Sequence, residues 1–179
     1  SNANSLLQEI TLSVSNLEPT EITNTNANNG KGRIFIVGMP RSGSTLLETI
    51  LSMNPEIKDL GESRCLRTSI AKIQQQLERK FDHPSLNELY SKMEPLDNSK
   101  HKYSTDKRLY NFIYINWIAT QMPAAKIIHS CRNPMDNILS MYRSNLTAGN
   151  NYTSNLEDAA KVLVAHERAM QIQKNRHPE

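Results

Sequence analysis

The sequence contains little cysteine and lacks long apolar runs. Only Cys65 and Cys131 occur among 179 residues, and their separation fits neither a CxxC zinc pair nor the dense disulfide framework of a small secreted domain. We therefore expect a reduced, cytoplasmic protein. Because no apolar stretch approaches the roughly 20 residues of a membrane-spanning helix, we expect no membrane partner.

The chain also has little excess charge. Its 21 Lys+Arg and 18 Asp+Glu leave a formal net charge of +3, which is too small and dispersed to indicate nucleic-acid binding but is compatible with a local pocket for a small anion. The five histidines show no metal-ligand spacing, so we expect no metal. Length and the 37% hydrophobic content are typical of one globular domain with a real core.

The N-terminal part is polar and differs from the rest. Residues 1–3 resemble the remnant of a removed tag, and we treat residues 4–32 as an N-terminal extension and linker. A short amphipathic helix is expected over 6–17, and the Asn-, Thr- and Gly-rich segment 24–32 is typical of a linker. The organised domain is therefore expected over residues 33–179.

Two units follow a strand, loop, helix order. Residues 33–37 form a β-branched run between two glycines, which predicts a buried central parallel strand, and the apolar residues after it recur at helical spacing up to Asn54-Pro55. A second strand is predicted over 126–131, before a helix that opens at Asn133-Pro134. This helix carries an apolar stripe, composed of Met135, Ile138, Leu139, Tyr142 and Leu146.

The remaining pattern alternates in the same way. Further helices are expected over 62–79, 109–121 and 155–174, with a short strand over 102–105. Strands alternating with helices predict an α/β fold with a parallel sheet covered on both faces. In such sheets ligands bind beyond the carboxyl ends of the strands.

The loop after the first strand has the spacing of a phosphate-binding loop. It reads Gly38-Met39-Pro40-Arg41-Ser42-Gly43-Ser44-Thr45, with Ser44 where nucleotide hydrolases have Lys. Glycines allow successive backbone N–H groups to converge on an anion, and Arg41 can supply the missing positive charge. The alternative is a tight turn with a capping serine, which the placement between a buried strand and an amphipathic helix disfavours.

Two motifs resemble the sulfotransferase superfamily, whose members use 3′-phosphoadenosine 5′-phosphosulfate. The loop matches the family's PxSGST-type motif, and the resemblance implies that Pro40, Arg41, Ser42, Gly43, Ser44 and Thr45 hold the 5′-phosphosulfate end. Cys131-Arg132-Asn133-Pro134 and the following Ser140 resemble the second motif, which implies that Arg132 and Ser140 bind the 3′-phosphate. The alternative for these two is a surface Arg and a neutral helix position. The implied fold is a P-loop-like three-layer sandwich with a central parallel sheet.

Two further segments resemble the branch that includes tyrosyl-protein and tetratricopeptide-linked sulfotransferases. Gly61-Glu62-Ser63-Arg64 is similar to a Gly-Glu-x-x-Arg region with its Arg one position early, and implies that Glu62 is the catalytic base. The segment from Asp106-Lys107 to Asn111-Phe112 is similar to Asp-Lys-x-Pro-x-Asn-Phe, with Leu109 replacing Pro. It implies that Lys107 neutralises charge on the transferring sulfuryl group or its bridging oxygen. Arg41 of the loop after the first strand is a further catalytic candidate. The alternatives are a helix-start Glu and a solvated Lys.

The resemblance implies transfer of a sulfuryl group from 3′-phosphoadenosine 5′-phosphosulfate to the hydroxyl of a small molecule, peptide or carbohydrate. Two alternatives stay open: a P-loop nucleotide kinase, disfavoured because the loop Lys and a second carboxylate motif for Mg²⁺ are absent, and a nucleotide-binding module without turnover. Family members typically continue with another strand and helices. We therefore expect this chain to lack the C-terminal part of the family domain and to be poorly active by itself.

Overall fold

A single parallel sheet organises the chain. The computed structural model describes residues 2–15, 26–79, 84–144, 146 and 150–178. Within them the sheet has four strands in the order β2-β3-β1-β4, and every neighbouring pair is parallel. The strands are β1 (Arg33–Gly38), β2 (Ile57–Asp59), β3 (Tyr103–Asp106) and β4 (Lys126–Ser130).

Strand β1 lies in the interior of the sheet, as its sequence predicts. Phe35, Ile36 and Val37 have no exposed surface, which explains why the run is apolar at successive positions and does not alternate. Its last residue, Gly38, pairs with Ser130 of β4. The carboxyl ends of these two strands therefore meet at one edge of the sheet.

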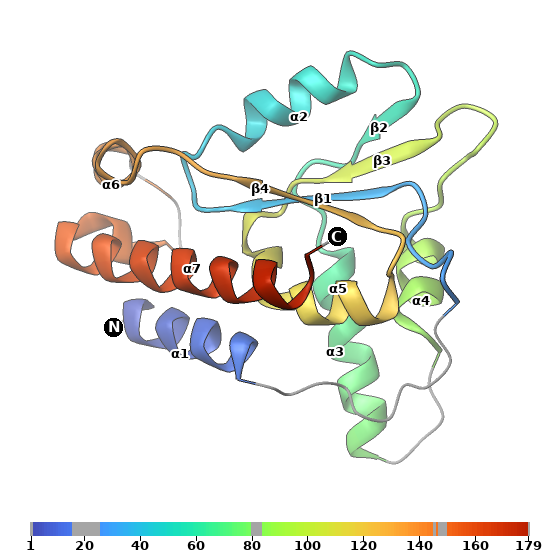
Figure 1. Ribbon diagram of the computed structural model, residues 1–179, viewed down its shortest axis with the longest axis horizontal. Coiled ribbons are helices and arrows are strands. Elements are labelled where there is room, and N and C mark those ends of the chain that lie inside the picture. Colours follow the sequence, from blue (N-terminus) through green and yellow to red (C-terminus); the bar gives the residue numbers. More distant parts are fainter. Residues whose placement is uncertain (1, 16–25, 80–83, 145, 147–149, 179) are drawn as a thin grey trace.

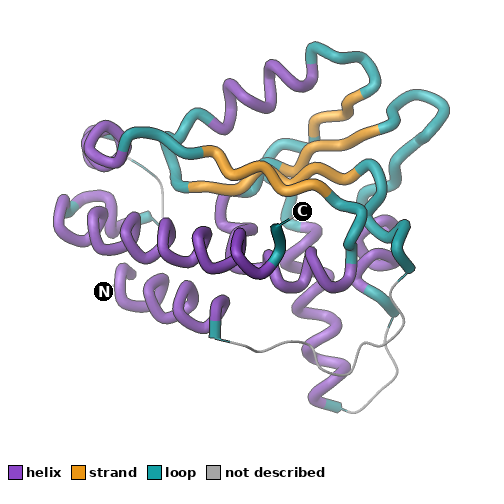
Figure 2. Tube along the Cα trace, in the orientation of Figure 1, coloured by secondary structure: helices purple, strands orange, loops and turns teal. Residues whose placement is uncertain are grey.

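Helices cover both faces of the sheet (Figure 1). Helix α2 (Ser44–Ser52) lies over one face, and α1 (Asn2–Val14), α3 (Cys65–Glu78), α5 (Ile115–Gln121) and α7 (Leu156–Arg176) lie on the opposite side. Helix α4 (Leu86–Met93) packs beside α3, and α6 (Pro134–Arg143) follows β4. Short 3₁₀ helices are η1 (Leu109–Tyr114) and η2 (Asn151–Ser154). The tube view in Figure 2 separates the layers and confirms the predicted α/β sandwich.

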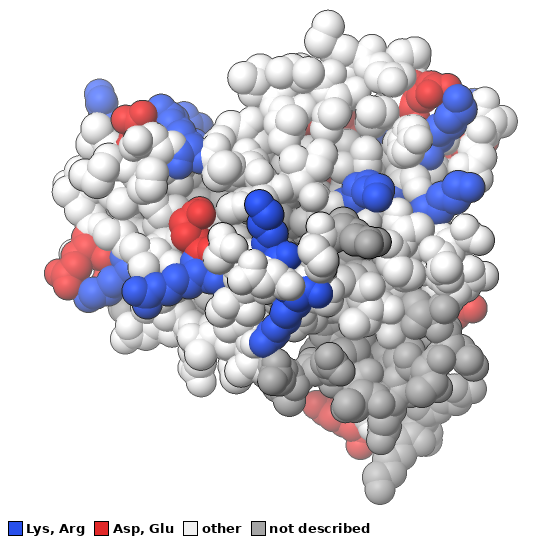
Figure 3. Space-filling model, viewed as in Figure 1, with Lys and Arg blue, Asp and Glu red and all other residues white. Residues whose placement is uncertain are grey.

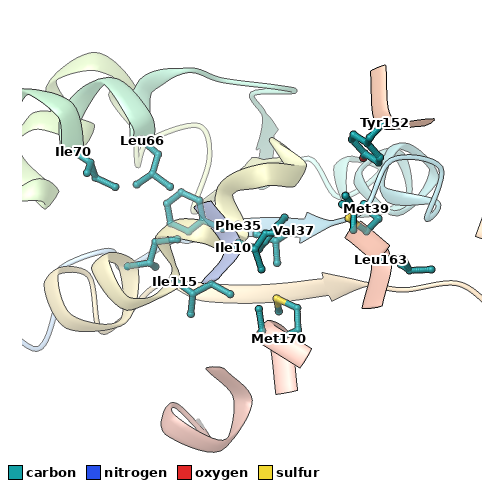
Figure 4. Close-up of a cluster of buried hydrophobic side chains, with 14 of the residues drawn as sticks. Ile10, Phe35, Val37, Met39, Leu66, Ile70, Ile115, Tyr152, Leu163 and Met170 are labelled. Carbon is teal, nitrogen blue, oxygen red and sulfur yellow. The ribbon is translucent and has the colours of Figure 1, made fainter. Parts of the chain in front are cut away.

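The main core lies between the sheet and α1, α3, α5 and α7. Figure 4 shows Phe35 and Val37 of β1 near Ile115 of α5 and Met170 of α7. Burial of each such side chain contributes about 1.5–3 kcal/mol to the free energy of unfolding. Strand β1 leads directly into residues 38–45, which we name the phosphate loop. The start of this loop is therefore fixed by the best-packed part of the molecule.

Helix α1 joins this core through the apolar side of its amphipathic sequence. It packs along α7, and its residues Ala3 and Ile10 belong to the buried core. Segment 2–14 thus belongs to the packed structure, including Ala3 of the expected tag remnant. The predicted helix end at residue 17 and the linker residues 24 and 25 lie outside the described residues.

Several element boundaries differ from the predictions. Helix α3 begins at Cys65, not at residue 62, because the backbone at Gly61 is left-handed (φ 60°) and the Ser63 hydroxyl accepts the Cys65 N–H. The helix predicted over 109–121 is divided into η1 and α5. Strand β2 and helix α4 were not predicted, although the Ser85–Glu88 capping box at the start of α4 is a recognisable signal.

Helix α6 forms as predicted, but most of the apolar stripe on it is exposed. Met135, Leu139 and Tyr142 are 74%, 50% and 48% exposed, whereas Asn137 and Met141 are buried. The inward side carries Asn137 because a backbone carbonyl of the phosphate loop needs a donor there. Leu146, the last residue of the predicted stripe, follows the helix.

Surface properties agree with the small net charge. On the face in Figure 3, Lys and Arg side chains are interspersed with Asp and Glu. Among the described residues no helix is long and apolar enough to cross a membrane. Cys65 and Cys131 are both free thiols.

Candidate functional site

The predicted site residues follow the four strands of the sheet at the same edge. The phosphate loop follows β1, Glu62 comes after β2, Lys107 directly follows β3, and Arg132 comes after β4. Because parallel strands end together, this topology gathers four short loops above the sheet edge.

The phosphate loop has a constrained backbone. Arg41 has a left-handed φ of 67°, and the Ser42 N–H bonds to the Met39 carbonyl at 3.3 Å. A residue other than glycine occupies this region only where its surroundings impose it. Two contacts provide that constraint: Asn137 Nδ2 donates to the Pro40 carbonyl at 2.8 Å, and the hydroxyls of Ser42 and Ser130 are 3.2 Å apart.

The amino terminus of α2 is open toward this loop. Its N-cap is Gly43, with φ 99° and no side chain to accept the first N–H groups of the helix. A Cβ built on Gly43 would meet no atom within 4 Å, so the backbone there borders open space. Unpaired N–H groups at a helix amino terminus attract anions.

Gly38, at the start of the loop, lies close to β4. A Cβ on Gly38 would lie 2.4 Å from the Ser130 carbonyl. The loop can therefore approach β4 this closely only because residue 38 has no side chain.

Arg41, Arg132 and Ser140 converge around this opening. Arg41 Nε donates to Ser140 Oγ at 3.3 Å, and Arg132 Nη1 reaches the Arg41 carbonyl at 3.5 Å. Both arginines are exposed, and in the described part of the chain neither forms an ion pair with a carboxylate. Two positive charges beside an open helix terminus make an anion-binding arrangement.

Glu62 and Lys107, the two residues predicted to take part in proton and charge transfer, contact each other. Lys107 Nζ donates to Glu62 Oε1 at 3.1 Å. The Glu62 side chain is 62% exposed, whereas the Lys107 side chain is only 11% exposed. A backbone bond of 2.7 Å from the Lys107 N–H to the Gly61 carbonyl fixes the two loops together. Lys107 is therefore not the solvated surface lysine that base rates favour.

Asp106 fixes the turn that carries Lys107. Its Oδ2 accepts the Tyr90 hydroxyl at 3.1 Å, and its Oδ1 accepts the Arg108 N–H at 3.1 Å and Asn111 Nδ2 at 3.2 Å. Burial raises the pKa of Asp106 to about 6, and the hydrogen bonds from Arg108 and Tyr90 oppose that rise. These three bonds orient the chain on both sides of Lys107.

A cleft of ≈ 610 Å³ connects the phosphate loop with Glu62. Pro40 and Glu62 both contact it, and Arg67 and Arg108 add positive charge to its wall. Burial raises the pKa of Tyr110 to about 12, and its hydroxyl donates to Asn150 Oδ1 at 2.6 Å. The other lining residues come largely from α1 and η1: Ser5, Leu6, Glu9, Leu109, Asn111, Ile113, Tyr114 and Leu146.

Three residues of the site were missed by the sequence reasoning. Asn137 and Ser130 hold the phosphate loop, and Glu48 is 6% exposed and accepts the Thr105 hydroxyl at 2.9 Å. Spacing offered a signal for two of them. Asn137 precedes Ser140 by three positions on α6, and Glu48 follows Ser44 by four on α2, so each shares a helix face with a predicted binding residue.

The fold is that of an α/β protein whose first strand leads into a glycine- and serine-rich turn with the spacing of a phosphate-binding loop. Residues 33–179 match the sulfotransferase family, and the chain belongs to this family. The chain is also similar to an uncharacterized protein of Aquifex aeolicus (strain VF5), at 32% identity over 135 residues. That match covers 66% of this chain and 18% of the relative, so the chain spans less than a fifth of that protein's length.

Proposed function

We propose that the chain is the catalytic part of a sulfotransferase that uses 3′-phosphoadenosine 5′-phosphosulfate and a hydroxyl acceptor. The observation that carries this proposal is the convergence of Arg41, Arg132 and Ser140 at the open amino terminus of α2. The Gly61-Glu62 and Asp106-Lys107 segments make the tyrosyl-protein and tetratricopeptide-linked branch our preferred subgroup.

The residues present fit a donor with two separated anionic groups. The backbone from Arg41 to Thr45 and the open face at Gly43 suit the 5′-phosphosulfate end. Arg132 and Ser140, which lie on the adjacent loop and on α6, suit the 3′-phosphate. A nucleotide kinase would use a loop lysine, whereas this chain has Ser44 at that position and two arginines nearby.

Glu62 and Lys107 provide groups for the transfer step. Glu62 accepts the proton of the acceptor hydroxyl while that oxygen forms a bond to sulfur, and the bond from sulfur to the 5′-phosphate oxygen breaks. Lys107 offsets the negative charge that grows on the departing oxygen. Their 3.1 Å contact brings the proposed base and the proposed cation together at one place.

The cleft between the phosphate loop and Glu62 is our proposed acceptor site. Its volume of ≈ 610 Å³ is sufficient for a small molecule or for one side chain or sugar of a larger acceptor. Tyr110 and Tyr114 offer aromatic surface, and Arg67 and Arg108 offer charge. We propose a small-molecule, peptide or carbohydrate hydroxyl as the acceptor.

Nucleotide-dependent thermal stability tests the donor. We expect 3′-phosphoadenosine 5′-phosphate to raise the Tm without Mg²⁺, because a ligand that binds only the folded state stabilises it by about 2.7 kcal/mol at 100 times its Kd. ATP at the same concentration should raise the Tm weakly or not at all. Equal shifts for the two nucleotides, or a requirement for Mg²⁺, would instead favour the kinase.

A further inference from the structure

Two histidines from distant parts of the sequence meet on the side of the sheet away from α2. His129 lies on β4 and His166 on α7, and their ring centroids are 5.0 Å apart. His166 has no exposed surface. The Nε2 atoms of both rings are buried and, among the described residues, have no hydrogen-bond partner. A buried polar atom without a partner is costly, so two such atoms in contacting rings need an explanation.

Glu167 adds a carboxylate to this pair. Its Oε1 is 3.2 Å from His166 Nδ1 and 3.9 Å from His129 Nε2. If His166 Nε2 carries the ring proton, the lone pair of His166 Nδ1 faces the Glu167 oxygen. A cation between these two atoms would be bound by both of them.

We propose that His129, His166 and Glu167 bind a divalent transition-metal ion, for which Zn²⁺ is the best candidate. One possible ligand atom from each residue lies within 4.8 Å of the others. Two imidazole nitrogens and one carboxylate oxygen are a donor set that Zn²⁺ accepts. Ligands bound at about 2.0–2.1 Å in a tetrahedron are about 3.4 Å apart, so small side-chain rotations close the site.

A cleft gives an ion access to these residues. Its volume is ≈ 750 Å³, and both His129 and Glu167 line it. The His129 side chain is 26% exposed and the Glu167 side chain 45%, so both have freedom to adjust while His166 stays fixed. Water from the cleft can complete the coordination.

This site is distinct from the phosphate-binding opening. Successive side chains of a strand point to opposite faces, and Ser130, next to His129, contacts Ser42 of the phosphate loop. The metal would therefore lie across β4 from the loop. Sequence spacing did not predict it because the sheet and α7, and not a local motif, bring the ligands together.

Metal titration of the tag-free, chelator-treated chain tests the proposal. We expect Zn²⁺ to raise the Tm in a saturable one-to-one manner that EDTA reverses, and Co²⁺ to give visible absorption bands of a nitrogen- and oxygen-bound ion. His129→Ala and Glu167→Gln should each weaken Zn²⁺ binding at least about tenfold. His101→Ala, which removes a histidine outside this cleft, is the matched control and should bind like the wild type.

Three results of the binding experiments would overturn the site. They are no one-to-one binding by the wild type, no cobalt spectrum, or equal affinity in Glu167→Gln and the wild type. Glu167 is half-exposed, so we expect Glu167→Gln to fold. It therefore tests the site even if His129→Ala does not fold. A His129→Phe protein that is more stable than the wild type in excess Zn²⁺ would mean that the rings are only a packed pair against Phe112, which contacts His166 edge-on.

Discussion

Lys107 Nζ lies 3.1 Å from Glu62 Oε1 and joins the loops that follow two adjacent strands. The cation is buried and the carboxylate faces the cleft. A stabilising ion pair alone would contribute little with one partner so exposed. The contact therefore contributes little to the stability of the fold. We propose that its importance lies in the chemistry of the cleft.

Glu62→Gln tests the proposed base. The change keeps the shape of the side chain and removes its basicity, so we expect donor-nucleotide affinity to be nearly unchanged and sulfuryl transfer to fall by roughly two to four orders of magnitude. The assay follows labelled sulfate from the donor to a panel of phenols, peptides and carbohydrates. It should use this chain and any longer protein of which the chain is a part.

The control for this prediction is Glu56→Gln. Glu56 forms an ion pair with Lys102 near the opposite end of β3 and is likewise partly exposed. Its loss should leave transfer unchanged. Normal turnover by Glu62→Gln would exclude Glu62 as the base, whereas a longer wild-type protein that binds donor but transfers to no acceptor would favour the binding module.

Arg132→Ala tests the proposed 3′-phosphate contact. A hydrogen bond to a charged group contributes about 1.5–3 kcal/mol, so the variant should bind 3′-phosphoadenosine 5′-phosphate about 10- to 100-fold more weakly. The analogue without the 3′-phosphate should lose little affinity. Titration calorimetry with both nucleotides measures the difference.

Arg143→Ala is the matched variant for Arg132, because it removes an exposed arginine from the last turn of α6. We expect it to bind both nucleotides like the wild type. If Arg132→Ala weakens the two nucleotides equally, Arg132 contacts another group or supports the loop.

Two glycines of the phosphate loop should respond differently to alanine. Gly43→Ala adds a Cβ that meets nothing within 4 Å, so its cost in stability is only the left-handed backbone, about 1–2 kcal/mol. Because the new methyl group occupies the proposed anion space, nucleotide affinity should fall more than stability. Gly38→Ala places a Cβ 2.4 Å from the Ser130 carbonyl and should cost a further ~1–3 kcal/mol.

Urea unfolding and nucleotide titration of the two variants separate these effects. A Gly43→Ala protein that binds 3′-phosphoadenosine 5′-phosphate as the wild type does would place the anion away from α2. A Gly38→Ala protein no less stable than Gly43→Ala would mean that β1 and β4 tolerate separation at this point.

The parts of the fold that depend on local sequence were predictable. Strand β1 is marked by its β-branched run, and the loop by its glycines and serines. Asn155 caps α7 as predicted, with its side chain accepting the Asp158 N–H. These signals act over a few residues, so one sequence is enough to read them.

The inward face of α6 and the contact of Glu62 with Lys107 depend on tertiary structure. Periodicity assumes that an apolar stripe faces the core, but α6 buries Asn137 because the Pro40 carbonyl requires a donor. The two histidines of the proposed metal site show the same limit, since only the packing of α7 under β4 makes them neighbours. Sequence identified the residues of the phosphate loop, and the fold determines what surrounds them.

The buried Asp106 should make the stability of the fold depend on pH. Its pKa in the folded protein is raised to about 6 from an ordinary 3.8, chiefly because it is buried. The folded state therefore holds this proton more tightly than the unfolded chain does, and the free energy of unfolding should fall as pH rises from about 4 to about 6. The gap corresponds to a loss of about 3 kcal/mol.

Asp106→Asn isolates this contribution because it removes the ionisation and keeps one oxygen acceptor for the surrounding donors. Urea unfolding at pH 4, 5, 6 and 7 should show the wild type losing stability relative to the variant between pH 4 and 6, with a constant difference above that. Asp97→Asn is the control of opposite sign, since hydrogen bonds from Ser99 lower the pKa of the exposed Asp97. A carboxyl with a lowered pKa stabilises the fold as pH rises, so this variant should lose stability relative to the wild type at higher pH. Parallel pH curves for the wild type and Asp106→Asn would mean that Asp106 ionises in the folded protein as readily as in the unfolded chain.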